Sequence, residues 1–117
     1  MVADEATPAA PSTAIRVGAP VVTLVNVFTV AEGRQVQLID ILDRATRQVM
    51  RHLPGFVSAN IHRSLDGTKV VNYAQWQTVD AFQAMLANPE ARSHMQEATS
   101  IATAAPALYE VASVQQA

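Results

Sequence analysis

Alternating patterns of apolar and polar residues divide the chain into strands and helices. Apolar and β-branched residues fill positions 21–30, which predicts a strand. From Arg34 onward the apolar residues recur at steps of three and four as far as Leu53, which predicts a helix. Pro54-Gly55 is expected to end that helix, because proline cannot continue it and glycine accepts the conformation that follows.

Two further strands are expected on either side of a tight turn. They span Phe56 to Ser64 and Lys69 to Gln77. The segment between them contains Asp66-Gly67, a pair favoured in two-residue hairpin turns because both central residues take positive φ. The two strands should therefore pair in antiparallel.

Helix-capping residues organise the C-terminal part. Thr78 is a suitable cap for a helix over residues 79–87, and Asn88-Pro89 is a suitable start for a helix reaching about residue 103. Pro106 then ends the helical pattern, so the last strand is expected over residues 108–115.

The resulting order, strand–helix–strand–strand–helix–strand, is the ferredoxin-like arrangement of the α+β class. It places four antiparallel strands in one sheet with the helices on one face. The other face would expose a large apolar patch, which a two-fold dimer packing sheet against sheet would cover as a dimeric α+β barrel. The residues expected on that bare face are Val25, Val27, Val57, Ala59, Ile61, Val71 and Tyr73.

The first twenty residues differ from the rest of the chain. Residues 1–20 are rich in alanine, proline, serine and threonine and have no helical or strand period. We expect an N-terminal arm there, either flexible or lying on a neighbouring subunit, followed by one domain over residues 21–117.

The composition excludes several classes of function. There is no cysteine, which excludes disulfides, thiolate metal sites and a cysteine nucleophile. The net charge is −2 with a single lysine, so nothing favours nucleic-acid binding. The N-terminus is acidic, unlike a secretory signal, and no run approaches the roughly 18 apolar residues that cross a bilayer. We therefore expect a cytoplasmic protein that binds neither nucleic acid nor membrane.

One face of the predicted sheet collects polar side chains among apolar ones. Asn72 and Trp76 are four residues apart on one strand, so they share a face. Asn26, in the strand over residues 21–30, and His62, in the strand over residues 56–64, are expected to face the same side of the sheet. A mostly apolar surface with a few placed polar groups is typical of a small-molecule pocket.

Each of these residues also has a purely structural interpretation. Trp76 can be a core aromatic, and His62 can be a partly exposed strand residue near the hairpin. Asn26 and Asn72 can each satisfy a backbone group at a strand end or bulge. The grouping of the two amides and the indole on one inferred face is more informative than any one of them.

Three stretches resemble the antibiotic biosynthesis monooxygenase family. Residues 22–30, Val-Thr-Leu-Val-Asn-Val-Phe-Thr-Val, resemble the first strand of the nogalamycin-type anthrone oxygenases. Pro-Gly-Phe at 54–56 and the segment from Asn72 to Trp76 resemble the actinorhodin-type monooxygenase. The resemblance implies a ferredoxin-like homodimer that uses O2 to oxidise an anthrone-type aromatic polyketide without metal or other cofactor.

The same resemblance implies roles for individual residues. Asn26, Asn72, Trp76 and His62 become candidate catalytic residues. The amides would donate hydrogen bonds to the oxyanion of the substrate, the indole would steady reduced oxygen, and His62 or pocket water would accept the proton. The candidate substrate-binding residues are Leu24, Phe28, Phe56, Phe82, Met85 and His94.

Departures from the family pattern leave alternatives. Where the actinorhodin-type enzyme has a tyrosine and an arginine, this chain has Phe82 and Gln96, so the amide–indole mechanism is the one implied. Haem degradation is a second possibility, since Asn26 and His94 match haem-degrading relatives, although their helix tryptophan is replaced near Met85 or Leu86. Quinol oxidation and a non-catalytic, dimeric ligand-binding role are the remaining alternatives.

Overall fold

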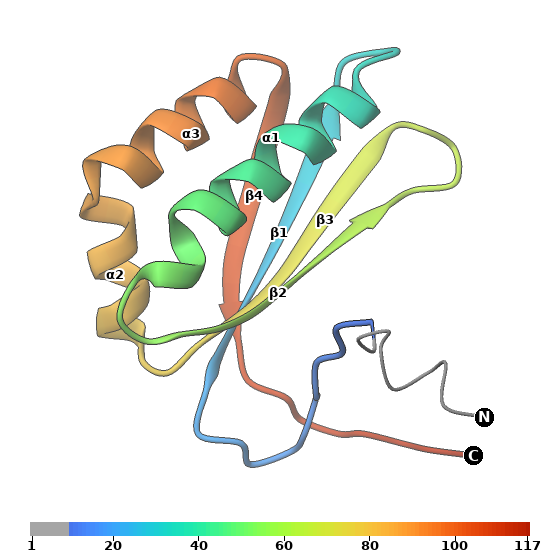
Figure 1. Cartoon of the computed structure of the whole chain (residues 1–117). Helices are drawn as coiled ribbons and strands as arrows, with labels where there is room; N and C mark the ends of the chain where they lie inside the picture. The colour runs from blue at the N-terminus through green and yellow to red at the C-terminus, as the bar shows by residue number, and fades with distance from the viewer. Residues whose placement is uncertain (1–9) are drawn as a thin grey trace, which may run out of the picture.

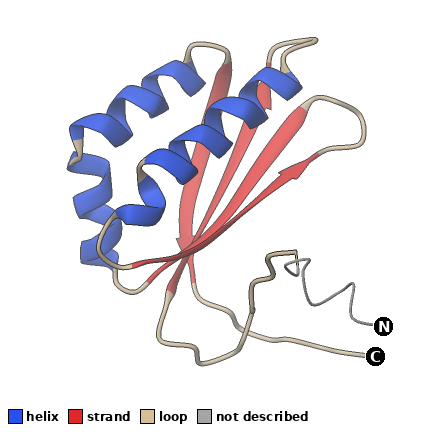
Figure 2. Ribbon diagram, viewed as in Figure 1, coloured by secondary structure: helices blue, strands red, loops and turns tan. Residues whose placement is uncertain are grey.

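A four-stranded antiparallel sheet forms one layer of the protein, and three α-helices form a second layer on one of its faces (Figures 1 and 2). The computed structural model describes residues 10–117. The α+β ferredoxin-like fold expected from the sequence is confirmed. The elements are β1 (Val22–Val30), α1 (Gln35–Gln48), a 3₁₀ helix (Met50–His52), β2 (Phe56–Arg63), β3 (Lys69–Trp76), α2 (Val79–Ala87), α3 (Pro89–Thr99) and β4 (Ala102–Tyr109).

The strand order is β2-β3-β1-β4, so β1 and β3 are the central strands and β2 and β4 the edges. The last strand lies earlier in the sequence than predicted, because α3 ends at Thr99 and β4 begins at Ala102. The prediction treated Pro106 as a break, whereas it is part of β4 and lies opposite Asn26 of β1. An edge strand tolerates proline because one side of it needs no hydrogen-bond donors.

The caps of the two later helices are as predicted. The hydroxyl of Thr78 accepts a hydrogen bond from the backbone N–H of Ala81 at 3.0 Å. The side-chain oxygen of Asn88 accepts from the N–H groups of Glu90 and Ala91, with Pro89 in the first turn. Each cap satisfies N–H groups that have no partner inside the helix.

The turn between β2 and β3 differs from the predicted two-residue form. Within residues 10–117 no residue other than glycine has positive φ, so Asp66 does not take the conformation that such a turn requires. Instead the loop is closed by Ser64 and Lys69, and only Gly67 is left-handed, with φ of +81°. The Asp66 carboxylate accepts hydrogen bonds from the Ser64 hydroxyl and from the N–H and hydroxyl of Thr68.

The hydrophobic core lies between the sheet and the helices. Leu38, Ile41, Leu42 and Ala45 form the buried stripe of α1 at helical spacing. Around it, one cluster of the core includes Phe28 and Val70, and the other includes Leu24, Trp76 and Phe82. The face of the sheet that carries Trp76 is therefore the covered one.

A β-bulge reverses the phase of β2 with respect to the prediction. Phe56 lies opposite Trp76, but the register shifts between Phe56 and Ser58, so that Ala59 lies opposite Ala74. From that point the odd-numbered residues of β2 face the helices and the even-numbered ones face the other way. The prediction that Ala59 and Ile61 lie on the uncovered face was therefore wrong.

Residues 10–21 lie on the sheet face opposite the helices (Figure 1). The hydroxyl of Thr13 donates to the side-chain oxygen of Asn60 at 2.8 Å, and the amide of Gln75 donates to the backbone carbonyl of Ala14 at 3.1 Å. The described part of the predicted arm thus packs on its own domain. Residues 1–9 of that arm lie outside the described residues, and the domain boundary near residue 20 stays a prediction.

The rest of this outer face is apolar and half-buried in the single chain, with Val25, Val27, Val71 and Tyr73 at its centre. Within residues 10–117, no helix has both the length and the apolar character that a membrane span requires.

Candidate active site

Three of the four predicted catalytic residues share the helix-facing side of the two central strands. Asn26 of β1 lies directly opposite Asn72 of β3, and Trp76 lies further along β3, opposite Val22 and Phe56. The prediction that the two amides and the indole share a face is confirmed. It succeeded because β1 and β3 pair without a bulge, so their side chains alternate strictly.

Each of these side chains has one buried polar atom without a partner in the described part of the chain. Asn26 Oδ1, Asn72 Oδ1 and Trp76 Nε1 are buried and make no hydrogen bond within the described residues, and Asn26 and Trp76 are only 8% and 2% exposed. Leaving one buried polar group unsatisfied costs about 1–3 kcal/mol, so native proteins rarely do so without a reason. The fourth such atom is Thr23 Oγ1, on the opposite face of β1.

Asn72 and Trp76 line a narrow cavity of about 40 Å³ between the sheet and the helices. That volume is enough for a very few water molecules and far too small for a fused ring system. All three methionines of residues 10–117 are in its wall, and methionine is the apolar residue that adapts most readily to a new shape. The full lining is Leu24, Leu42, Ala45, Thr46, Met50, Phe56, Ala59, Asn72, Ala74, Trp76, Met85 and Met95.

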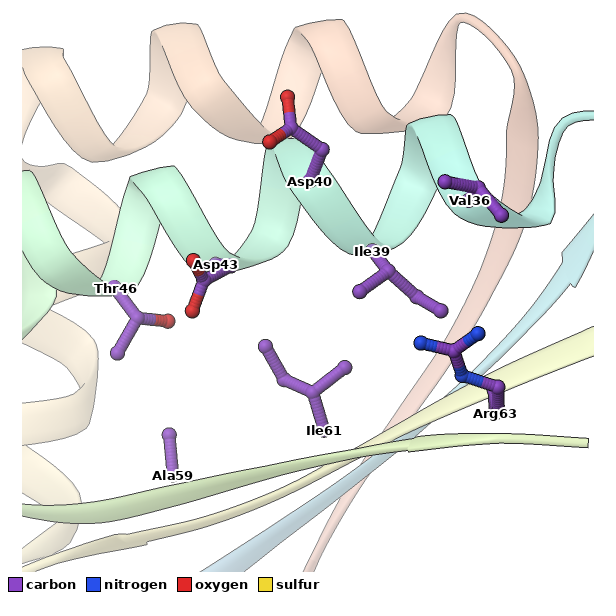
Figure 3. Close-up of a pocket in the computed structure, with 8 residues that line it drawn as sticks. All are labelled: Val36, Ile39, Asp40, Asp43, Thr46, Ala59, Ile61 and Arg63. Carbon is purple, nitrogen blue, oxygen red and sulfur yellow. The ribbon is translucent and has the colours of Figure 1, made fainter. Parts of the chain in front are cut away.

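A much larger groove adjoins this cavity. It has a volume of about 520 Å³ and runs between α1 and the edge strand β2 (Figure 3). Thr46 and Ala59 line both spaces, so the groove and the cavity meet at these two side chains. Its volume is within the range of small-molecule sites. The other residues lining it are Val36, Ile39, Asp40, Asp43, Ile61 and Arg63.

The acidic side chains of the groove are already paired. Asp40 accepts a hydrogen bond from Arg44 Nε at 3.0 Å, and this bond is the main reason why the pKa of Arg44 is raised. Asp43 pairs with Arg47 one turn further along α1. Arg63 of β2, by contrast, makes no salt bridge with the carboxylates of residues 10–117. Within the same residues, no three His, Asp or Glu side chains gather as metal ligands.

The other predicted site residues divide into two groups. Leu24, Phe56 and Met85 line the cavity. Asn26, Phe28 and Phe82 are buried on the helix-facing side without lining it, and half-buried His94 on α3 lines neither the cavity nor the groove.

The prediction placed His62 on the wrong face of the sheet. It was expected to share a face with Asn72 and Trp76, but it lies on the outer face and is exposed. The cause is the bulge after Phe56, because one extra residue turns every later side chain of β2 to the other side.

Several cavity residues were not predicted. Leu42, Thr46 and Met50 repeat at steps of four along α1 and the turn that follows, so they form one stripe over the cavity. That spacing is a signal present in the sequence. Met95 of α3 completes the wall with Met50 and Met85.

Comparison with known proteins connects this geometry to a family. The model of the family described as antibiotic biosynthesis monooxygenase matches residues 21–97. The tetracenomycin-F1 monooxygenase of Streptomyces glaucescens is 47% identical over 89 residues, which is 76% of this chain and 80% of that protein.

Solved structures agree with the family match. SnoaB, a cofactor-independent oxygenase from Streptomyces nogalater, superimposes with a TM-score of 0.72 at 30% identity, covering 80% of this chain and 95% of SnoaB. A monooxygenase from the ActVA-Orf6 gene of Streptomyces coelicolor, solved with nanaomycin D, gives a TM-score of 0.67 at 28% identity over 81% of this chain and 92% of that one.

Proposed function

Because the chain belongs to the antibiotic biosynthesis monooxygenase family and is an enzyme of that monooxygenase type, we propose that it oxidises an anthrone-type polycyclic aromatic polyketide to a quinone. The proposed oxidant is O2, without a metal or flavin. The observation that carries this proposal is the set of unpartnered polar atoms of Asn26, Asn72 and Trp76 beside an apolar cavity.

The substrate class follows from what such a site can do chemically. An anthrone loses a proton readily because its anion is aromatic, and that anion can pass electrons to O2. One O2 then gives the quinone and one water. The protein needs to bind the rings, stabilise the anion and admit oxygen to a dry space, and apolar walls with a few polar groups meet these needs.

The two amides and the indole have distinct parts in this proposal. A terminal amide carries both an N–H₂ donor and a carbonyl acceptor, and rotation of the group exchanges them. Asn72 would donate a hydrogen bond to the substrate oxyanion from the cavity wall, with Asn26 beside it on β1. Trp76 carries only a donor, so its indole N–H suits a reduced, negatively charged oxygen species.

Binding of a ring system requires the cavity to widen. We propose that the rings lie along the α1–β2 groove, with the reacting edge inserted past Thr46 and Ala59. Movement of Met50, Met85 and Met95 would provide the extra volume, since long unbranched side chains change rotamer at little cost.

We also propose a homodimer. The outer face carries Val25, Val27, Val71 and Tyr73, which form an apolar patch beside the N-terminal segment. A second copy packed sheet against sheet would bury it.

The test is oxygen uptake with an anthrone by protein stripped of metal and flavin. Asn72→Ala and Trp76→Phe should each lower kcat by about 10²- to 10³-fold, the usual loss for a donor that stabilises developing charge. His62→Ala is the matched control, because His62 lies on the outer face and its loss should leave the rate unchanged. Unaltered rates in both site variants would remove the amide and indole from the mechanism.

A further inference from the structure

Resting on the function proposed above, we propose that Arg63 is a specificity-determining residue that binds a carboxylate on the aromatic substrate at the outer end of the α1–β2 groove. The substrate class then narrows to carboxylated polycyclic aromatics. Three observations carry this inference: where the side chain points, which charges around it are already neutralised, and how far it lies from the cavity.

The bulge in β2 directs Arg63 into the groove rather than away from it. Arg63 lies opposite Val70, which is fully buried on the helix-facing side of β3. With strict alternation after the bulge, Ala59, Ile61 and Arg63 all face α1. Figure 3 shows the guanidinium rising from β2 toward α1, beside Ile39 and Val36.

The charges of the groove leave Arg63 available. Asp40 is bonded to Arg44, which also lies 3.7 Å from Glu97, and Asp43 is paired with Arg47. Arg63 alone among the charged groove residues has no partner within residues 10–117. Its guanidinium presents several N–H donors in a planar fork, which matches a carboxylate better than any other common group.

The distance from Arg63 to the cavity suits one end of a fused ring system. Ala59 lines both the groove and the cavity, and Arg63 is four residues further along β2. At about 3.3 Å per residue, the two positions are roughly 13 Å apart. A ring system with its reacting edge at Asn72 would lie over Ala59 and Ile61 and bring a distal carboxylate to Arg63.

The experiment compares two anthrones that differ only in a distal carboxylate and its methyl ester. For the wild-type protein the acid should have the lower KM. Arg63→Gln should raise the KM of the acid about tenfold, as expected when a hydrogen-bonded charge pair is lost near the surface, and should leave kcat and the KM of the ester unchanged. Arg63→Lys should restore part of the difference, because lysine keeps the charge but not the fork.

Two controls separate this inference from the proposed function. Arg51→Gln removes an exposed cation outside the groove and should change neither KM. Dissociation constants measured without oxygen, by quenching of Trp76 fluorescence, test the Arg63 contact even if no anthrone is turned over. Equal affinity of wild type and Arg63→Gln for the acid, or an equal loss for acid and ester, would overturn the inference. In that case Arg63 serves as an inward-pointing charge that protects an edge strand from pairing with other chains.

Discussion

Gln75 and Trp76 are neighbours in the sequence and both are buried, but only Gln75 has hydrogen-bond partners for its side chain. Gln75 faces the outer side of β3, where its side-chain oxygen accepts from the Ser58 hydroxyl at 2.8 Å and its amide donates to Ala14. Trp76 faces the helices, where its indole N–H has no partner among residues 10–117. A satisfied polar group needs no ligand to explain it, whereas an unsatisfied one next to a cavity indicates that something else binds there.

The buried polar side chains are therefore mostly hydrogen-bonded on the outer face of the sheet and unsatisfied on the covered face. On the outer face, the Ser58–Gln75 pair fastens the N-terminal segment to the domain. On the covered face, Asn26, Asn72 and Trp76 each have a buried polar atom that no described residue satisfies, which lowers stability. Thr23 is the exception on the outer face, because its buried hydroxyl is also unpartnered and nothing in the structure accounts for it.

The sharpest way to break this comparison is Asn72→Leu, which replaces an unpartnered amide with an apolar group of similar size. Turnover of an anthrone should fall about 10²- to 10³-fold, because the donor to the oxyanion is lost. Stability should stay the same or rise, since an unsatisfied group is removed. Oxygen uptake and urea unfolding measure the two effects. A clear loss of stability would show that the amide has a structural partner in solution.

Gln75→Leu should give the opposite result. It leaves the Ser58 hydroxyl and the Ala14 carbonyl without their partner, so the free energy of unfolding should fall by about 1–3 kcal/mol. The kcat for an anthrone should not change, because the side chain points away from the cavity. Comparison of Ser58→Ala, Gln75→Leu and the double variant would isolate the energy of the pair. If Gln75→Leu abolished turnover without loss of stability, the division between the two faces would be wrong.

Asp66→Asn should have the smallest effect on stability. It measures how much the hydrogen bonds of the Asp66 carboxylate stabilise the exposed turn. The N–H of Thr68, followed by the hydroxyls of Ser64 and Thr68, lowers the pKa of Asp66 from 3.8 to about 2. A lowered pKa means that the charged form stabilises the fold above pH 4 and that this contribution is lost as the pH falls from about 4 to 2. The variant should lose this part of the pH dependence, which NMR titration of the carboxyl and acid unfolding curves would detect. An ordinary pKa for Asp66 would contradict the hydrogen bonding described here.

Much of the fold could be predicted because local signals agreed with tertiary structure. The capping residues Thr78 and Asn88 begin helices where their side chains can accept from backbone N–H groups, and β1 is a β-branched run in a central strand. β4 was misplaced because an edge position removes the penalty of Pro106, and edge position depends on topology rather than on local sequence.

The site residues were predicted correctly on the regular strands β1 and β3, whereas the prediction for the bulged strand β2 was wrong. Asn26, Asn72 and Trp76 follow simple alternation, whereas His62 follows a bulge. One signal for the bulge was present: Phe56 and Ile61 are both large, apolar and five residues apart, so they can face the same core only if one residue between them is extra. Met50 and Met95 reach the cavity wall because of how the 3₁₀ helix and α3 pack on the sheet, and the pattern of a single strand does not encode that packing.

The extra residue of β2 also marks the one place in this strand where a residue can be lost without changing which side chains face the groove. Removing Val57 would leave Phe56 opposite Trp76 and Ser58 opposite Gln75 in regular alternation, so Ala59, Ile61 and Arg63 would still face α1. The amides and indole of the central strands would stay in place. The same deletion at Asn60, beyond the bulge, would turn Ile61 and Arg63 outward and bring His62 beneath α1, so the effect of losing one codon on the groove depends on which side of Ala59 it falls.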